Sequence, residues 1–474
     1  MFISKLPAGV RLAASVCVLG LGLAAPRAAD ADTLADALVG AYTYSGLLEQ
    51  NRALLRAADE DVAVAAAALK PVLRWSAGLT QNFGRVRTSA SRVTIDNDDL
   101  TAALNLIAEL VLYDFGSRRL RIEAAKESVL ATREALLDIE QQILLRAVAA
   151  YMGVIEAQEF VALRENNVRL LTQELRAAQD RFDVGEVTRT DVALAQAQLA
   201  QARSGLAAAR GELVSAVEEY RNVVGRDPGT VRQPSSLPAI RENVDAAKAV
   251  AVRNHPSLKS AQHQVAAADL LARATLSDMK PTINLTGRLA ATENLNANEF
   301  NRGGSIGLEA GQTIYQGGAL SATARRAQAQ ADAQRGNLHT VRNDVTQDVG
   351  NAYATLTTVQ AQLAASERQV RAAQIAFDGI REEAALGART TLDVLDAEQA
   401  LLDAQSLQVQ ARAALYVAAY RILASTGRLT AKDLRLPVQL YDPAEYYNLV
   451  KDSPARLSKQ GRQLDRVLKS LQKD

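Results

Sequence analysis

Two carboxylates and an arginine are grouped in one short stretch near the C-terminal end of the chain. Gly387–Asp396 reads Gly-Ala-Arg-Thr-Thr-Leu-Asp-Val-Leu-Asp, so Arg389 is followed by Asp393 and Asp396. Two residues three positions apart lie on the same face of an α-helix, so these carboxylates share one face. Taken alone, the pair is typical of a solvated helix face, and the chemistry that it offers is the attraction of cations.

A second copy of this stretch lies 202 residues earlier in the chain. Gly185–Leu194 reads Gly-Glu-Val-Thr-Arg-Thr-Asp-Val-Ala-Leu, with Asp191 at the place of Asp393. The same offset relates Gly185 to Gly387, Tyr113 to Tyr315 and Gly116 to Gly318. Nearer the N-terminus the offset becomes 210, which relates Lys70-Pro71 to Lys280-Pro281. The chain is therefore one design used twice, with eight extra residues (210 minus 202) in the first copy.

The composition favours long helices over a thick globular core. Of the 474 residues, 48% are hydrophobic but only 4% are aromatic. Material rich in Ala, Leu, Gln, Arg and Glu forms helices and coiled coils. The formal net charge is +1, so no global field favours a nucleic acid as partner.

The N-terminal residues have the pattern of an export signal. Lys5 and Arg11 precede an apolar run at 12–25. Ala29-Asp30-Ala31 then offers small residues at the spacing of a cleavage site. The run is shorter than the ~20 apolar residues that span a membrane, and we predict no transmembrane helix after it. The single cysteine, Cys17, lies inside this signal, so we expect no disulfide in the mature chain.

The repeat and these signals divide the chain into five segments. They are a signal peptide at 1–31, a first repeat at 32–226, a linker at 227–241, a second repeat at 242–428 and a charged C-terminal tail at 429–474. Each repeat is expected to contain a helix, a β-hairpin, a long helix and a return helix.

In each repeat a helical pattern ends at Lys-Pro and gives way to a β-hairpin. In the first repeat, 73–79 and 104–112 alternate apolar and polar residues around a polar loop at 84–99. In the second repeat, 283–289 and 306–314 alternate in the same way. These patterns predict four strands of about ten residues each, the length that crosses a bilayer when tilted.

Aromatic and acidic residues in these strands favour a membrane position. Tyr113, Phe115 and Tyr315 cluster at the helix side of the strands, as in an interfacial girdle. By their alternation Glu109 and Glu309 should face a lumen, because carboxylates on a lipid face would be costly. The alternative from the residues alone is two soluble hairpins with one wet face.

Two uninterrupted helical patterns, at about 116–184 and 318–386, follow the hairpins. At 1.5 Å per residue each reaches about 100 Å, a length that suits a fibre, a stalk or a tube. The return helix of the first repeat has large residues at one heptad position and small ones three residues later. These are Val192, Leu199, Leu206, Leu213 and Tyr220, and Ala195, Ala202, Ala209, Ala216 and Val223. Such a large/small seam lets two helix backbones approach closely along their length.

No group of residues indicates catalysis or metal binding. His255, His263 and His339 are scattered and lack the spacing of metal ligands. Gly303-Gly304 and Gly317-Gly318 are not followed by the Lys-Ser/Thr of a phosphate loop. We therefore expect neither an enzyme nor a bound metal or cofactor.

Four strands cannot close a membrane barrel, since the smallest barrels have about eight. If the hairpins lie in a membrane, their edge strands must pair with other copies of the chain. The consistent solution is a ring of protomers with a transmembrane β-barrel that continues into a long α-helical barrel. Two other classes stay open: a periplasmic coiled-coil adaptor, and a structural coiled-coil protein.

The chain resembles the TolC family of outer-membrane efflux proteins over nearly its whole length after the signal. The resemblance is carried by Ala41-Tyr42, Lys70-Pro71, Leu112–Gly116, Phe182–Gly185, Thr190–Val192, Tyr315–Gly318 and Gly387–Ala397. It implies a mainly α, α+β fold and a homotrimer, with a twelve-stranded barrel in the outer membrane and a helical barrel through the periplasm. It also implies an exit duct that passes substrates from an inner-membrane ABC or RND-type transporter with a periplasmic adaptor protein.

The resemblance gives the glycine turns and the acidic pair their roles. It implies that Gly185 and Gly387 lie at the periplasmic mouth, where the helix pairs turn back and an adaptor docks. Asp393 and Asp396 would then project into that mouth as a ring of carboxylates. Tyr113, Gly116, Tyr315 and Gly318 would mark the turns at the barrel end.

The resemblance also implies a latch that keeps the mouth closed. Arg389 would tie its hairpin to Thr190 and Asp191 of the neighbouring one. A tyrosine that commonly joins this network in the family is replaced here by Ala384. We therefore expect a latch that is weaker or that uses another residue.

Overall fold

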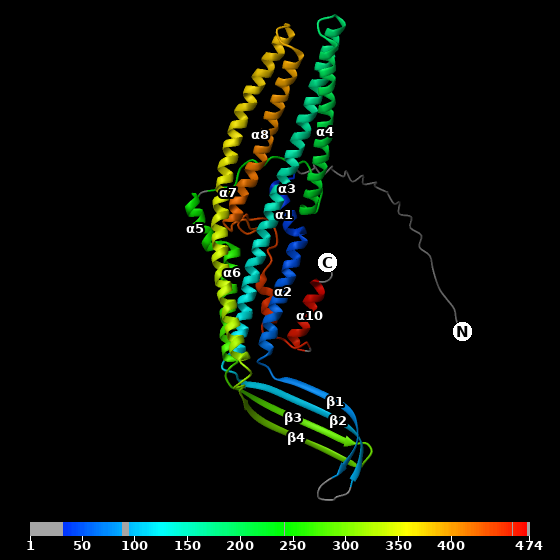
Figure 1. Ribbon diagram of the computed structural model, residues 1–474, viewed down its shortest axis with the longest axis vertical. Coiled ribbons are helices and arrows are strands. Elements are labelled where there is room, and N and C mark those ends of the chain that lie inside the picture. The colour runs from blue at the N-terminus through cyan, green and yellow to red at the C-terminus, as the bar shows by residue number, and fades with distance from the viewer. Residues whose placement is uncertain (1–31, 88–93, 241, 457, 472–474) are drawn as a thin grey trace, which may run out of the picture.

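The molecule is long and narrow, with a helical body that ends in a β-sheet at one end and in two helical hairpins at the other (Figure 1). The computed structural model describes residues 32–87, 94–240, 242–456 and 458–471. The predicted signal peptide at 1–31, with Cys17, lies outside the described residues, as does position 241 of the linker.

Both halves of the chain contain the same series of elements. The first half has α1 (Leu34–Tyr44), α2 (Gly46–Ala67), β1 (Val72–Arg87), β2 (Thr94–Tyr113), α3 (Ser117–Asp183) and α4 (Arg189–Val224). The second half has α5 (Val244–Asn254), α6 (Pro256–Ser277), β3 (Thr282–Asn294), β4 (Glu299–Gly311), α7 (Ala319–Ala385) and α8 (Thr391–Ser425). The predicted long helices are confirmed, because α3 and α7 each contain 67 residues.

The large/small seam of the return helices is buried as the heptads predict. In α4 the small residues Ala195, Ala202 and Ala209 are buried against α3. In α8 the same holds for Ala404, Ala411 and Ala418. Because Ala side chains occupy these positions, each return helix packs closely along its long partner and forms an antiparallel hairpin with it.

The four strands form one antiparallel sheet in the order β1-β2-β3-β4. The register sets nearly all the large apolar side chains on one face of the sheet. Exposed on that face are Leu73, Trp75, Leu79, Phe83, Leu104, Leu106, Leu289, Ile306 and Leu308. The other face carries polar residues, among them Arg288, which donates a hydrogen bond to Asn105 at 3.1 Å. Glu109 and Glu309 lie on this polar face, as their alternation predicted.

The strands differ from the prediction at their ends. The polar segment at 84–99 was expected to be a loop, but β1 continues to Arg87 and β2 begins at Thr94. The reason is cross-strand pairing: Arg85 forms an ion pair with Asp96 at 2.8 Å, and Gln81 donates a hydrogen bond to Asp98. In the second repeat β4 ends at Gly311, so the predicted strand residue Ile314 lies outside the sheet.

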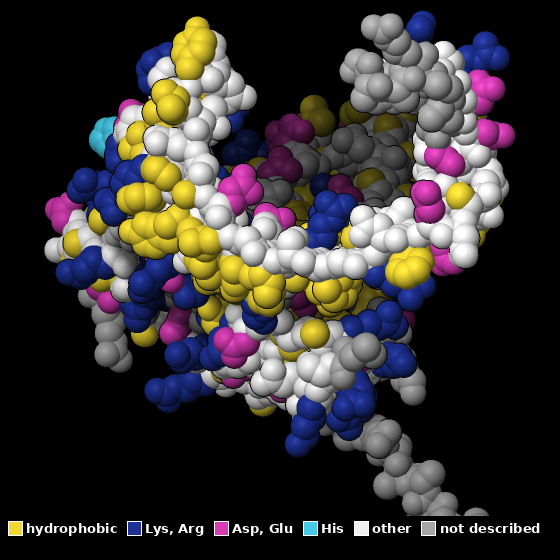
Figure 2. Space-filling view, turned by 90° about the horizontal axis from the view of Figure 1, so that it is seen from below, with side chains coloured by type: hydrophobic (Ala, Val, Ile, Leu, Met, Phe, Trp, Pro, Cys, Tyr) yellow, Lys and Arg dark blue, Asp and Glu magenta, His cyan; other side chains and the backbone are white. Residues whose placement is uncertain are grey.

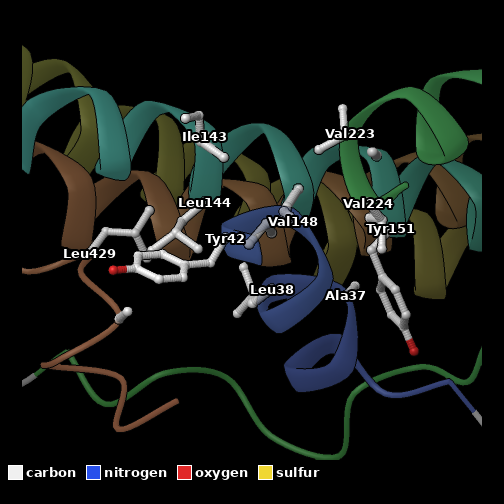
Figure 3. Close-up of a cluster of buried hydrophobic side chains, with 14 of the residues drawn as sticks. Ala37, Leu38, Tyr42, Ile143, Leu144, Val148, Tyr151, Val223, Val224 and Leu429 are labelled. Carbon is white, nitrogen blue, oxygen red and sulfur yellow. The ribbon is translucent and has the colours of Figure 1, made fainter. Parts of the chain in front are cut away.

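The main hydrophobic core lies where the short helices pack on α3. Leu38 and Tyr42 of α1 lie against Leu144 and Val148 of α3, as Figure 3 shows. Leu429 joins this core and is fully buried. The segment after 428, described above as a charged tail, is thus in part a structural element that covers the core.

The rest of the C-terminal segment runs along α2 toward the sheet, turns there, and then runs back away from the sheet (Figure 1). Its helices are α9 (Pro443–Val450) and α10 (Lys459–Leu471). Tyr446 and Val450 of α9 are buried against Ala63 of α2. The Lys70 ammonium, just before β1, donates to the backbone oxygen of Ser453 at 2.8 Å and so ties this segment to the start of the sheet. In the described part of the chain, no helix combines the length and the apolarity needed to cross a membrane.

Tyr151 gives a test of this packing. Its hydroxyl is buried and has two backbone acceptors for its single proton, Asp32 O at 2.8 Å and Arg232 O at 2.6 Å. We predict that Tyr151→Phe lowers the free energy of unfolding by about 1–3 kcal/mol, because buried acceptors lose their donor. The repeat supplies a matched control: Tyr353 donates only to Glu242 O, at 2.9 Å, in a half-buried place. Tyr353→Phe should have a smaller effect in the same denaturation experiment, and equal effects would contradict this account.

Candidate functional site at the hairpin tips

Each hairpin turns at a glycine in the left-handed region. Gly185 has φ +84° and Gly387 has φ +79°, which side chains other than glycine rarely adopt. The amide of Glu186 donates to Arg181 O at 2.9 Å, and the amide of Ala388 donates to Glu383 O at 2.9 Å. These bonds close the last turns of α3 and α7 and direct the chain back into α4 and α8. The two tips lie at the end of the molecule opposite the sheet (Figure 1).

The return helices begin with identical capping boxes. The Asp393 carboxylate accepts hydrogen bonds from the Thr390 amide and hydroxyl, both at 2.9 Å, and the Thr390 hydroxyl accepts from the Asp393 amide. Asp191 and Thr188 make the same contacts in the first hairpin, at 2.8 and 2.7 Å. The bonds from Thr390 hold the pKa of Asp393 below its ordinary range, and those from Thr188 do so for Asp191. Both aspartates are therefore ionised and fixed at the tips.

Asp191 and Asp393 were predicted to belong to a latch and a ring, whereas in the single chain both are capping residues. The Thr-x-x-Asp spacing before an apolar helix was the signal that could have revealed them. Asp396 differs from Asp393, because it is exposed and makes no hydrogen bond or ion pair with another described residue. Its carboxylate is thus available to solvent ions.

Arg389 contacts a carboxylate of its own hairpin. Its Nε lies 2.8 Å from the Glu383 carboxylate, at the last turn of α7. Thr190 and Asp191 lie on the other hairpin, and within the described part of this one chain neither is bonded to Arg389. The predicted latch therefore stays a prediction about contacts between copies.

The comparisons with known proteins agree with this architecture. The model of the outer membrane efflux protein family matches residues 45–226 and 249–428. The outer membrane efflux protein BepC of Brucella suis is 36% identical over 93% of this chain and 95% of its own length. The outer membrane protein TolC of Escherichia coli is 24% identical over 80% of this chain and 78% of its own length. The chain belongs to the outer membrane efflux protein family.

A solved structure shows the same fold. The outer-membrane channel OprN superposes with a TM-score of 0.72 over 83% of this chain and 89% of its own, at 23% identity. The predicted fold class is confirmed, as are the family and its outer-membrane location with a long periplasmic helical extension. The family is one of channels and not of enzymes, which agrees with the lack of a catalytic constellation in the sequence.

The chain turns sharply from sheet to long helix in both repeats. Gly116 and Gly318 both have φ +83° and stand immediately before α3 and α7. Asp114 accepts from the amides of Gly116 and Arg118, both at 3.0 Å, and so caps the start of α3. Tyr113 contacts Phe115, with ring centroids 4.8 Å apart, whereas Tyr315 is largely exposed. The four predicted turn residues thus lie together at the base of the sheet.

Ala384 fills a position inside its hairpin. It is buried with Phe377 of α7 and with Val394 and Leu401 of α8. The Ala384 methyl group packs in the seam between α7 and α8, and it has no polar atom that could form a hydrogen bond with a neighbouring residue. Ala384 therefore contributes to the apolar packing within the second hairpin, and its effect on a latch stays a prediction.

A buried polar bond that was not predicted from the sequence joins the two hairpins in this region. Asn167 of α3 donates a hydrogen bond to the Glu398 carboxylate of α8 at 2.6 Å. Glu398 follows Val394 by four residues and precedes Leu401 by three, so it lies beside the apolar stripe of its helix. A charged residue beside the apolar stripe of a helix was the signal in the sequence that could have revealed this bond.

The caps lead to a prediction about the tips. Replacing Thr390 with Ala removes a hydrogen bond to the N3 amide and should weaken the first turn of α8 by about 1 kcal/mol. We expect faster hydrogen exchange at residues 391–394 and unchanged exchange in α4. Thr188→Ala should produce the mirror effect at 189–192 only. Exchange rates that do not change at either tip would contradict the capping role.

Proposed function

We propose that three copies of this chain form an exit duct through the outer membrane, closed at the hairpin tips by charged contacts. The observation that carries the proposal is the sheet at one end of the molecule. Hydrophobic side chains form a band along the outer face of the sheet (Figure 2), which farther from the helices also carries Arg302 and Glu293, and the opposite face is polar. Among the described residues, the outer edges of β1 and β4 have no partner strand. A single copy leaves both the apolar side chains and the edge backbone groups exposed to solvent.

A ring of copies covers both the exposed apolar side chains and the exposed edge backbone groups. Strand β1 of one copy pairs with β4 of the next, so that three four-stranded sheets close a twelve-stranded barrel without an edge. The apolar face then meets outer-membrane lipid, and Glu109 and Glu309 face the lumen. Trp75, which is 71% exposed in the single chain, becomes a lipid contact.

The helical hairpins extend this ring into the periplasm. In the trimer the three pairs of tips meet around the axis, where Asp396 and the capped Asp393 of each copy contribute negative charge. Arg389 bonds to Thr190 and Asp191 of a neighbouring copy and thereby holds the mouth closed. In this role it exchanges its contact with Glu383 for one between subunits.

The partners follow from this position. The tips around Gly185 and Gly387 are the part of the molecule farthest from the sheet, and they dock a periplasmic adaptor protein. The adaptor connects the duct to an inner-membrane transporter of the ABC or RND type, which supplies the substrate. Because hydrogen-bonded turns and capping boxes fix the backbone of the tips, their surface is preorganised for binding the adaptor protein.

The Arg389 contact can be tested in planar bilayers. We predict that Arg389→Ser raises the single-channel conductance, because the link between neighbouring hairpins is lost. Glu383→Gln provides the matched control: it frees Arg389 from its own hairpin, so conductance should stay at the wild-type level or fall. If both variants raise conductance equally, the ion pair inside the hairpin, and not a latch between copies, holds the mouth.

The acidic ring can be tested separately. Asp396→Asn removes one carboxylate per copy and leaves the α8 cap intact, so we predict weaker cation selectivity and weaker block by trivalent cations. Asp403→Asn is the control, since it removes an exposed carboxylate from the same helix two turns farther from the tip. An unchanged reversal potential in Asp396→Asn would remove this residue from the aperture.

A further inference from the structure

A carboxyl group is buried between the two hairpins, two turns from the start of α8. The Glu398 side chain is 4% exposed, and its Oε1 accepts the hydrogen bond from Asn167 Nδ2 at 2.6 Å. Its other oxygen, Oε2, is buried and has no hydrogen-bond partner among the described residues. Because α3 belongs to the first hairpin and α8 to the second, this buried bond is one of the contacts that join the two.

Apolar and amide side chains surround the pair. On one side Leu171 of α3, Leu199 of α4 and Leu395 of α8 form a buried cluster. On the other side Phe377 of α7 packs with Leu401. The bond lies at a cleft of about 350 Å³ whose polar lining includes Asn166, Gln173, Gln374 and Gln405. If the hairpins separate, this cleft opens and water reaches the carboxyl.

The charged groups near Glu398 do not neutralise it. Glu174 of α3 and Arg381 of α7 form an ion pair with each other at 3.2 Å. Arg169 of α3 is exposed and bonds to Asn166, while α4 presents Leu199 and Ala202 at this level. On α8 itself Asp396 and Asp403 are exposed. No described cation forms an ion pair with Glu398.

Burial therefore decides the protonation of this group. Loss of water raises the pKa of Glu398 from 4.5 to about 7, although the bond from Asn167 lowers it. Glu174 raises the pKa further, and Arg381 opposes that effect. A carboxyl that titrates near neutral pH is thus placed at a contact between two moving parts.

The internal repeat shows that this arrangement is specific to one contact. The 202-residue offset relates Glu398 to Gln196 and Asn167 to Gln369. Both glutamines are exposed in the single chain, and neither can titrate. Of these two repeat-related pairs, the one at the contact between α3 and α8 is the one that carries a titratable group.

We propose that Glu398 is a positioning residue of the gate: through Asn167 it holds the second hairpin against the first, and its protonation strengthens that closure. The inference rests on the proposed gating at the tips. Glu398 touches no substrate; it acts through the position of α8, which carries Asp393 and Asp396.

The direction of the pH effect follows from linkage. With the hairpins together the pKa is about 7, whereas a hairpin that has moved into water has the ordinary value of 4.5. Between these two values the closed arrangement binds a proton that the open one releases, so rising pH favours opening. A shift of this size changes the ratio of open to closed channels by up to roughly two orders of magnitude. Below about pH 4.5 and above about pH 7 the ratio should be flat.

The experiment records open probability and conductance of the purified full-length protein in planar bilayers from pH 4 to 8.5. Wild type should open as pH rises through this window. Glu398→Gln, which keeps the shape and the hydrogen bond but cannot ionise, should stay closed and lose the pH dependence. Asn167→Ala should open more at every pH, because the link is absent. Glu382→Gln, at an exposed carboxylate of α7, should behave as wild type.

Arg389→Ser separates this inference from the gate on which it rests. If Arg389→Ser opens the channel but Glu398→Gln retains the wild-type pH profile, the role of Glu398 is wrong and the gate stands. If Arg389→Ser has no effect and no variant changes with pH, the gate at the tips is wrong as well. A loss of pH dependence in Glu398→Gln alone, with Glu382→Gln unchanged, supports the proposal.

Discussion

A helix of about 100 Å has a narrow apolar stripe that must be covered along its whole length, and this requirement shapes the molecule. Each long helix meets it with a return helix that contributes small residues at every heptad. The close approach of the backbones makes the hairpins stiff. Charged groups placed at Gly185 and Gly387 are therefore held far from the core without a globular domain to support them.

The same architecture, long hairpins without a globular domain, leaves surfaces that one chain cannot cover. The sheet has an apolar face with Trp75 and Leu308 exposed and two free edges, and the hairpins have seams on one side only. A soluble protein of this size buries such groups in its own core. Here the main core lies where the short helices and the segment from Leu429 pack on α3, and in the proposed duct lipid and further copies complete the rest.

The sequence was sufficient where a feature depends on local periodicity. The 202-residue repeat, the ends of α3 and α7 and the turns at Gly116 and Gly318 follow from heptads and from glycine, which are visible in a few neighbouring residues. Contacts between distant segments were not predictable in this way. The strand pairing of Arg85 with Asp96, the packing of Leu429 and the bond from Asn167 to Glu398 each join residues whose types are ordinary in their own segments.

Comparison of the two repeats separates what builds the fold from what controls it. Features that both copies share, such as the capping boxes of Asp191 and Asp393, are needed for a hairpin to turn and return. Features present in one copy only cannot be required for the hairpin, because the other copy forms without them. Arg389 with Glu383 belongs to this second class and lies at the tip of the second hairpin, as does Glu398 of α8, which is bonded to Asn167 of the first hairpin. In the proposed duct, this asymmetry places control of the mouth in the second hairpin, on a scaffold that the first repeat forms without it.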